Sequence, residues 1–375
     1  MSQTKFAPWV DPDEKPLIRF QNVTKRFGAF TAIENLTLDI YEREFFALLG
    51  PSGCGKTTLM RMLAGFEAAS EGVITLNGQD LAPIPPNKRE VNMMFQSYAL
   101  FPHLSVYDNI AFGLKRSTMP RGEIDARVQQ MLKMVKLEKF ARRKPHQISG
   151  GQRQRVALAR SLAKAPKLLL LDEPLGALDK KLREETQFEL MDIQEKTGTT
   201  FVIVTHDQEE AMTVASRVAV MDEGRIIQVD TPDRIYETPN SVYVADFIGD
   251  VNLIEGTAGA ATEGRIPMSW AEGQPDIVCA SEAEVAAGTR VHFAIRPEKV
   301  RISKDKPEDL RNAVPGRVHD IGYLGNISTY HVELANGMFI KAQVANSHRI
   351  GRRSFTWDDQ VWLGWTDTAG MVLDR

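Results

Sequence analysis

Residues 50–57, which read Gly-Pro-Ser-Gly-Cys-Gly-Lys-Thr, constrain the fold of this chain more than any other segment. They follow the apolar run at 44–49 and precede a helical pattern that begins at Thr58. The spacing G-x-x-x-x-G-K-[ST] between a strand and a helix is typical of a phosphate-binding loop. Its glycines let backbone N–H groups wrap closely around a polyphosphate, and the helix N-terminus adds partial positive charge. The segment therefore predicts an α/β fold with a polyphosphate site, because a chance glycine-rich turn would not need both flanking elements.

The residues of this loop have distinct expected tasks. Lys56 would reach the β- and γ-phosphates of a bound nucleotide, and the Thr57 hydroxyl would ligate Mg²⁺. Cys54 is expected to be a small filler, since no base stands beside it in the sequence. The expected contacts to the nucleotide are Gly50, Pro51, Ser52, Gly53, Cys54, Gly55, Lys56, Thr57 and Thr58.

Three apolar runs end in residues that we expect at one edge of a parallel sheet. The run at 44–49 leads into the phosphate loop, the run at 167–171 into an Asp-Glu pair, and the run at 201–205 into a histidine. Near-continuous apolar runs suit parallel strands that are buried on both faces. Because ligands bind at the carboxyl ends of such strands, all three endings should face one site.

The Asp-Glu pair, Asp172 and Glu173, is the expected reaction centre. Asp172 would hold Mg²⁺, and Glu173 would orient or deprotonate the attacking water. Alone, such a pair would be interpreted as a solvated turn. The buried strand before it and the phosphate loop earlier in the chain favour the catalytic interpretation.

Composition narrows the classes of protein that fit. The 375 residues suggest two domains, and 46 Lys and Arg against 49 Asp and Glu give a net charge of −3. This balance argues against a nucleic-acid partner, because such proteins are usually basic. A local basic patch is compatible with the balance, although the balance does not argue for one. Cys54 and Cys279 lie far apart and do not have the spacing of metal ligands, so we expect neither a disulfide framework nor a zinc site. This use of cysteine fits a protein of the reducing cytosol. The apolar runs fall short of the roughly 20 residues of a spanning helix, and we expect no signal peptide.

The pattern of apolar and polar residues changes near residue 245. Residues 1–245 alternate strand-like and helical patterns, which predicts a mostly parallel α/β domain, with a helical subdomain at about 97–166. Residues 246–375 show short segments of period two with turn residues such as Asn336-Gly337. This pattern predicts a small all-β barrel or sandwich.

A second glycine motif makes the chain resemble a known family. Ser149, Gly150, Gly151 and Gln152 stand at the start of a helical pattern, shortly before Asp172. This tetrapeptide resembles the signature motif of ATP-binding cassette (ABC) proteins, whose usual leading Leu is Ile148 here. The motif offers a hydroxyl and free N–H groups, and Ser149 can cap the helix.

Four further positions match the family's order of motifs. The resemblance implies that Phe27 stacks on adenine, that Gln96 touches Mg²⁺ and water, and that His206 lies near the γ-phosphate. Ala177, Leu178 and Asp179 resemble the D-loop, which also meets the nucleotide. Taken one at a time, these residues would be interpreted without a functional role: Phe27 as part of the core, Gln96 as a solvated loop residue and His206 as a histidine at the end of a strand. Their order over about 180 residues favours the functional interpretation.

The resemblance also implies partners. In the family, ATP lies between the phosphate loop of one subunit and the signature motif of the other, so a homodimer is expected. The residues around 97–106 would help to form a groove for a helix of a membrane permease. Residues 246–375 resemble the OB-like (TOBE-type) regulatory domain of importer ATPases, and the phrase at 294–300 is the most diagnostic.

The whole chain resembles ATPase subunits of bacterial polyamine importers, particularly of the putrescine kind. The resemblance implies a peripheral protein on the cytoplasmic face of the inner membrane, which serves a periplasmic polyamine-binding protein indirectly. Ferric iron or a sugar is the alternative cargo. A different class of function is that of the soluble ABC proteins that act in DNA repair or translation. A third is a regulatory binding module, in which residues 246–375 bind a metabolite or a signalling protein and control the ATPase.

Overall fold

The computed structural model describes residues 6–176, 178–281, 285–347 and 354–374. The chain divides into two compact units, Met1–Ile235 (unit 1) and Tyr236–Arg375 (unit 2). The division lies within a short helix, α7 (Pro232–Glu237). The domain limits inferred from the sequence, 1–245 and 246–375 with a helical subdomain at 97–166, stay a prediction.

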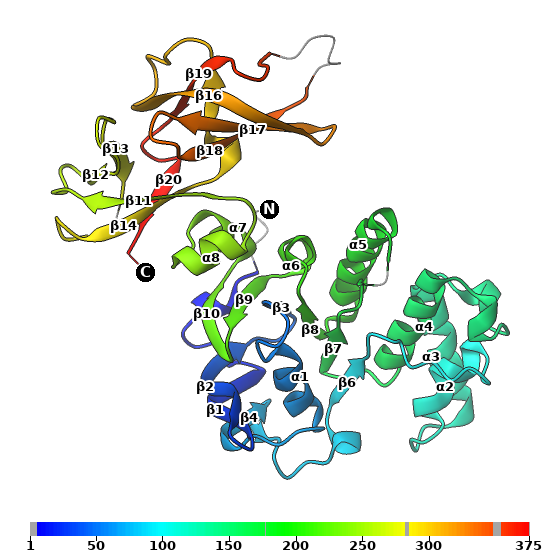
Figure 1. Cartoon of the computed structure of the whole chain (residues 1–375). Coiled ribbons are helices and arrows are strands. Elements are labelled where there is room, and N and C mark those ends of the chain that lie inside the picture. Colours follow the sequence, from blue (N-terminus) through cyan, green and yellow to red (C-terminus); the bar gives the residue numbers. More distant parts are fainter. Residues whose placement is uncertain (1–5, 177, 282–284, 348–353, 375) are drawn as a thin grey trace. The chain divides into compact units, whose positions relative to one another are not determined.

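A six-stranded, largely parallel sheet forms the centre of unit 1 (Figure 1). Its strand order is β10-β9-β3-β8-β7-β6, and only the β9–β10 pair among these is antiparallel. β3 and β8 are buried along their whole length, as the apolar runs predicted. The bounds are β3 (Phe45–Leu49), β6 (Val91–Met94), β7 (Leu168–Asp172), β8 (Thr200–Thr205), β9 (Arg217–Asp222) and β10 (Arg225–Asp230).

Unit 1 also contains a four-stranded antiparallel sheet, which the sequence analysis did not foresee. Its order is β2-β1-β4-β5, with β1 (Ile18–Phe27), β2 (Phe30–Ile40), β4 (Glu71–Leu76) and β5 (Gln79–Asp80). The connection between β1 and β2 is two residues long and begins with Gly28 at φ +58°. So short a connection can join only antiparallel strands, and the left-handed conformation favours glycine.

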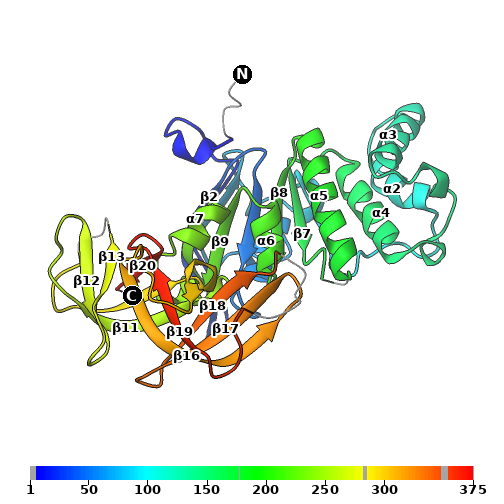
Figure 2. The same cartoon turned by 90° about the horizontal axis from the view of Figure 1, so that it is seen from above.

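Two groups of helices accompany the sheets of unit 1 (Figures 1 and 2). α2, α3 and α4 pack on one another and form the first group. The second group lies at the sheets: α1 contacts β2, β6, β7 and β8, and α6 contacts β3, β8 and α5. Four side chains begin helices by accepting a backbone N–H, as N-cap residues do: Ser105 (α2), Ser149 (α4), Asp179 (α5) and Asp207 (α6). The bounds are α1 (Lys56–Ala64), α2 (Val106–Leu114), α3 (Arg121–Met134), α4 (Gly150–Leu162), α5 (Lys180–Thr197) and α6 (Gln208–Val214), with 3₁₀ turns η1 (Pro8–Val10), η2 (Pro86–Lys88), η3 (Glu138–Phe140) and η4 (Pro145–Gln147).

A buried ion pair holds the start of β3 to β9. The Glu44 side chain is fully buried, and its two oxygens accept from Arg217 Nε at 2.6 Å and Nη2 at 3.1 Å. Arg217 Nη2 also donates to the Asp39 carbonyl at 2.8 Å. Burial raises the pKa of Glu44, against the opposing effect of Arg217. The pair therefore depends on both partners being present.

Unit 2 is built of two five-stranded antiparallel sheets around one core, which confirms the predicted all-β class. Phe293 and Trp365 lie buried in this core with ring centroids 6.1 Å apart. The first sheet has the order β13-β12-β11-β14-β20 and the second β15-β19-β16-β17-β18. The bounds are α8 (Val242–Phe247), β11 (Asn252–Ala258), β12 (Arg265–Ser269), β13 (Ile277–Ala280), β14 (Arg290–Ile295), η5 (Pro297–Lys299), β15 (Arg301–Ser303), β16 (Asn312–Tyr323), β17 (Ile327–Leu334), β18 (Phe339–Ala345), β19 (Gln360–Trp365) and β20 (Gly370–Leu373).

Candidate nucleotide site

The three strand ends singled out in the sequence lie side by side in the structure. β3, β8 and β7 are neighbours in the sheet and run parallel, with Leu49 opposite Thr205 and Asp172 opposite Val204. The phosphate loop, the Asp-Glu pair and His206 therefore leave the sheet at the same edge. Since this edge holds the carboxyl ends of the strands, it is where an open α/β sheet binds its ligand.

Glu173 stands at the centre of a hydrogen-bonded group at this edge. Its carboxylate accepts from Gln96 Nε2 at 2.9 Å and contacts His206 Nδ1 at 3.0 Å. The backbone of Glu173 is left-handed, with φ +43°, and its N–H donates to the Val204 carbonyl at 3.0 Å. A left-handed conformation is uncommon for a residue with a side chain. Gln96 and His206, which we expect near the attacking water and the γ-phosphate, thus meet Glu173 although they lie 77 and 33 residues from it in the sequence.

Asp172 lies next to this group at the end of β7 and is partly buried. Burial raises its pKa, the neighbouring charge of Glu173 raises it further, and Arg61 opposes both. A cation bound at this carboxylate would relieve the repulsion between the two acids. The donor set of one carboxylate and a threonine hydroxyl is one that Mg²⁺ accepts, because it keeps water and phosphate oxygens as its other ligands.

The phosphate loop wraps around its own lysine. The Lys56 residue is 6% exposed, and its ammonium donates to the carbonyls of Gly50 and Pro51, each at 2.7 Å. Cys54 is buried, as expected of a filler, whereas Ser52 and Gly53 are exposed. The remaining loop residues, Thr57 and Thr58, lie in the first turn of α1.

Gly55 shows why the loop needs glycine. Its φ is +104°, and a Cβ at this position would lie 2.5 Å from Ile33 Cδ1 and 2.7 Å from the Ala32 carbonyl oxygen. No side chain fits there, because the loop lies directly against β2. The close approach fixes the position of the N-terminus of α1, where an anion would bind.

The other predicted contacts lie outside this group. Phe27 ends β1, is 44% exposed, and has Lys25 Nζ 4.6 Å from its ring centroid. Ser149 caps α4, and its hydroxyl accepts from Gln152 N while the Gln152 side chain accepts from Ser149 N. In the part of the chain that the structure describes, no hydrogen bond joins residues 149–152 to residues 50–57. Gly150 and Gly151 open the first turn of α4.

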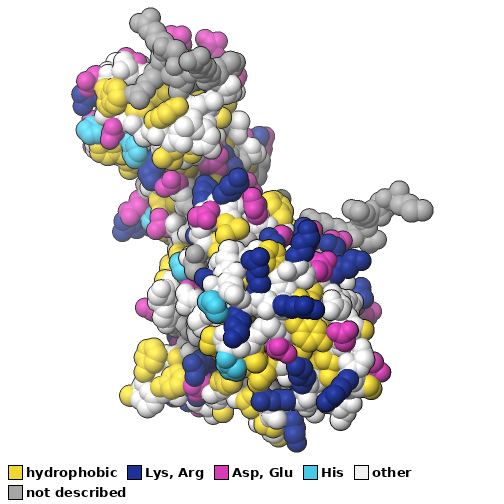
Figure 3. Space-filling view, turned by 90° about the vertical axis from the view of Figure 1, so that its right-hand side faces the viewer, with side chains coloured by type: hydrophobic (Ala, Val, Ile, Leu, Met, Phe, Trp, Pro, Cys, Tyr) yellow, Lys and Arg dark blue, Asp and Glu magenta, His cyan; other side chains and the backbone are white. Residues whose placement is uncertain are grey.

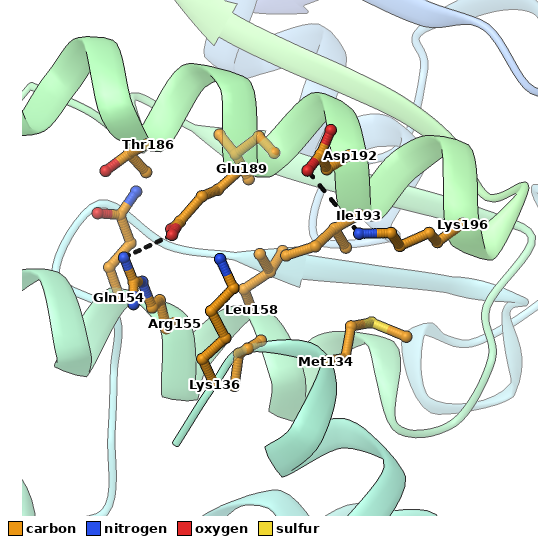
Figure 4. Close-up of a pocket in the computed structure, with 12 residues that line it drawn as sticks. Met134, Lys136, Gln154, Arg155, Leu158, Thr186, Glu189, Asp192, Ile193 and Lys196 are labelled. Atoms are coloured by element: carbon orange, nitrogen blue, oxygen red, sulfur yellow. Dashed lines mark hydrogen bonds and ion pairs between the residues drawn. The ribbon is translucent and has the colours of Figure 1, made fainter. Parts of the chain in front are cut away.

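The segment that resembles a D-loop is only partly described. Ala177 lies outside the described residues, Leu178 is buried, and Asp179 is exposed and caps α5 by accepting from Leu182 N at 3.1 Å. Figure 4 shows α5 against α4, where Arg155 and Glu189 form an ion pair with an N–O distance of 2.6 Å.

Sequence reasoning missed the residues that fix the loop around His206 in place. Asp207 caps α6, accepts from Arg183 Nη1 at 2.6 Å, and stands beside Glu210, which is 2% exposed. Burial raises the pKa of Glu210 to about 7. The cap could have been found, since Asp commonly precedes a helix. No signal in the sequence pairs Arg183 with Asp207, 24 residues away.

The sequence analysis did not locate two surfaces of unit 1. Phe66, after α1, and Phe95, after β6, are both exposed, and their rings lie 6.2 Å apart. Lysine and arginine side chains are frequent on the face of unit 1 that Figure 3 presents. The exposed basic residues of α3, of η3 and of the turns next to α3 include Lys115, Arg116, Arg121, Lys133, Lys136 and Lys139. The overall charge of −3 therefore conceals a local basic surface.

Comparison with known proteins gives matches over both units. Residues 33–176 match the ABC transporter family, and residues 293–373 match the TOBE domain. The putrescine transport ATP-binding protein PotG of Escherichia coli is 51% identical over 96% of this chain and 95% of its own length. The spermidine/putrescine import ATP-binding protein PotA is 48% identical in Nitrosospira multiformis, over 96% of this chain and 99% of that protein.

Two solved structures resemble part of the chain. CbiO1 from Clostridium perfringens, part of the ABC transporter complex cbiONQ, has a TM-score of 0.56 and 30% identity and covers 59% of this chain and 91% of its own. The dimeric structure of MJ0796, a bacterial ABC transporter cassette, has a TM-score of 0.51 and 33% identity and covers 57% of this chain and 98% of its own.

Proposed function

This chain belongs to the ATP-hydrolysing, ATP-binding proteins of the ABC transporter family, and we propose that it powers a bacterial importer of polyamines, with putrescine as the favoured cargo. The observation that carries the ATP-hydrolysis part of the proposal is the group of Gln96, Glu173 and His206 at the strand edge beside the phosphate loop. In this arrangement a carboxylate stands where an attacking water would be activated.

The proposed hydrolysis assigns each group a task. Glu173 accepts the proton of a water whose oxygen attacks the γ-phosphorus, while the bond to the β–γ bridging oxygen breaks. Gln96 and His206 orient the Glu173 carboxylate through the contacts at 2.9 and 3.0 Å. Lys56 exchanges its two loop carbonyls for the oxygens of the β- and γ-phosphates. Phe27, exposed at the end of β1, offers its ring face to adenine.

Magnesium fits the donors of this site. The Thr57 hydroxyl and the Asp172 carboxylate would hold the ion, and Gln96 would add its amide oxygen, since its amide nitrogen donates to Glu173. When bound, the ion neutralises charge on the β- and γ-phosphates.

A second copy of the chain completes the proposed site. Ser149, Gly150, Gly151 and Gln152 present a capped helix start that is not joined to the phosphate loop of the same chain. We infer that these residues and Asp179 contact the nucleotide bound to the partner subunit. The homologous cassette MJ0796 has been solved as a dimer and in a post-hydrolysis state bound to ADP and Pi. Because ATP then contacts both copies, it favours the closed dimer, and hydrolysis reopens it.

A separate permease is the proposed membrane partner. Among the helices of the described residues, none is both long enough and apolar enough to cross a bilayer. Phe66 and Phe95 form an exposed aromatic pair beside the segment at 97–106, and such a surface suits an incoming permease helix. The proposed location is the cytoplasmic face of the inner membrane, and a periplasmic polyamine-binding protein would deliver the cargo to the permease. The β unit, with its TOBE match, is the proposed regulatory part.

The names of the relatives support the cargo, and an uptake assay tests it. A strain that lacks this chain would receive it back on a plasmid, with K56A as the matched inactive control, and take up labelled putrescine or spermidine. We expect the parental chain, and not K56A, to restore putrescine uptake more than spermidine uptake. Equal restoration would overturn the preference for putrescine, and restoration of neither would overturn the polyamine assignment in favour of iron, sugar or a non-transport role.

A further inference from the structure

The loop that carries His206 is held on both sides by its neighbours. The Thr205 hydroxyl donates to the buried Glu210 carboxylate and accepts from Asp207 N at 3.0 Å. The Asp207 carboxylate accepts from Glu210 N at 3.1 Å through Oδ1, which caps α6. His206 itself is exposed and extends from this loop to Glu173.

A single arginine ties this loop to the segment before α5. Arg183 lies in the first turn of α5, and its Nη1 donates to Asp207 Oδ2 at 2.6 Å. Its Nη2 donates to the Leu178 carbonyl at 3.3 Å. Leu178 immediately precedes Asp179, the cap of α5. The planar guanidinium fixes both contacts in one geometry, which a lysine ammonium would not do.

We propose that Arg183 is a positioning residue for ATP hydrolysis: it couples the segment around Asp179 to the loop that places His206 against Glu173. The inference rests on the proposed roles of Glu173 and His206. If a nucleotide or a second subunit moves the segment around Asp179, Arg183 carries that movement to Asp207. The position of His206 then depends on the contacts made by Asp179.

The alternative is that the Arg183–Asp207 pair only stabilises the fold. The chain offers a matched control on the same helix, because Glu189 pairs with Arg155 at 2.6 Å (Figure 4). The side chains of this control pair are 26% and 27% exposed, against 29% and 26% for Arg183 and Asp207. Arg155 lies on α4, so E189Q breaks an equivalent ion pair that involves neither Arg183 nor Asp207.

The test compares R183M, D207N and E189Q in the full-length chain. Asn is as good a helix cap as Asp, so D207N weakens the ion pair and keeps the start of α6. We expect R183M and D207N to lower kcat by about tenfold to a hundredfold with little change in KM for ATP, as a misplaced catalytic group does. E189Q should lose a similar amount of thermal stability and keep its kcat. R183K should recover only part of the lost kcat, because lysine restores the positive charge but cannot hold both hydrogen bonds of the planar guanidinium in one geometry.

Two results would overturn the inference. One is that R183M and D207N keep the parental kcat, and the other is that E189Q loses as much activity as they do. H206A and E173Q are measured in the same series. If these two variants also keep full activity, the proposed roles of the site residues fail; if they are inactive while R183M is not, only the coupling role of Arg183 fails.

Discussion

Replacing Glu210 by Gln should stabilise unit 1 in a pH-dependent way. Glu210 is 2% exposed, and burial is the main cause that raises its pKa from 4.5 to about 7. Asp207 raises this pKa further, whereas the Thr205 hydroxyl, Arg183 and His206 lower it. A rise of this size corresponds to about 3 kcal/mol, at about 1.4 kcal/mol per pKa unit.

The sign of the effect follows from which state binds the proton. Below pH 4.5 the carboxyl is protonated in both the folded and the unfolded chain, so its burial carries no ionisation cost. Between pH 4.5 and about 7 the unfolded chain loses the proton while the folded chain keeps it, and stability falls as the pH rises. Gln cannot ionise, and its amide oxygen can still accept from Thr205. The advantage of E210Q should therefore grow from about 1 kcal/mol at pH 5 to about 3 kcal/mol at pH 8.

Urea unfolding at pH 5, 6, 7 and 8, followed by the far-UV signal of helices, measures this advantage. The signal reports unit 1, since the long helices α3, α4 and α5 lie there. E209Q is the control, because Glu209 is the exposed neighbour in the same first turn and its replacement should change stability by less than about 0.5 kcal/mol. An advantage of E210Q that is independent of pH, or that shrinks as the pH rises, would refute the reasoning.

Two further outcomes follow from the phosphate loop and the buried ion pair. K56A should weaken ATP binding by about tenfold or more, as titration calorimetry would show, because it removes the charge that meets the phosphates; unchanged affinity would contradict the proposed role of the loop. R217M should lower the free energy of unfolding by about 3–5 kcal/mol, because it leaves the fully buried Glu44 without its partner. The double variant E44Q/R217M should recover part of that loss in urea unfolding, and a double variant less stable than R217M alone would show that Glu44 is not the source of the penalty.

Local patterns were enough to predict the phosphate loop and the strand ends. The loop at 50–57 depends on glycines and on its two neighbouring elements, all of which are contiguous in the sequence. Glu173 and His206 could be placed together because buried apolar runs indicate parallel strands, whose carboxyl ends share an edge. Gln96 was assigned through the family resemblance alone, because the short strand β6 before it is only partly buried and does not stand out as an apolar run.

Other features depend on pairings that no local pattern reveals. In the antiparallel sheet of β1, β2, β4 and β5, the buried and exposed positions of β1 and β2 do not alternate regularly, so the period-two pattern of a strand is weak in the sequence. The order of the strands is decided by packing. The Arg183–Asp207 pair joins two helix starts that only the tertiary fold brings together. The basic surface around α3 is invisible in the net charge, because acidic residues outnumber basic ones over the whole chain.

The claim that two copies complete each other's nucleotide site is tested most directly by sedimentation of E173Q. This variant should bind ATP without hydrolysing it at a useful rate, so the closed state accumulates. The account predicts a dimer with ATP and Mg²⁺ and a monomer with ADP, while S149A added to E173Q should weaken the ATP-dependent dimer. An E173Q chain that stays monomeric at saturating ATP, together with a parental monomer that hydrolyses ATP at full rate, would contradict it.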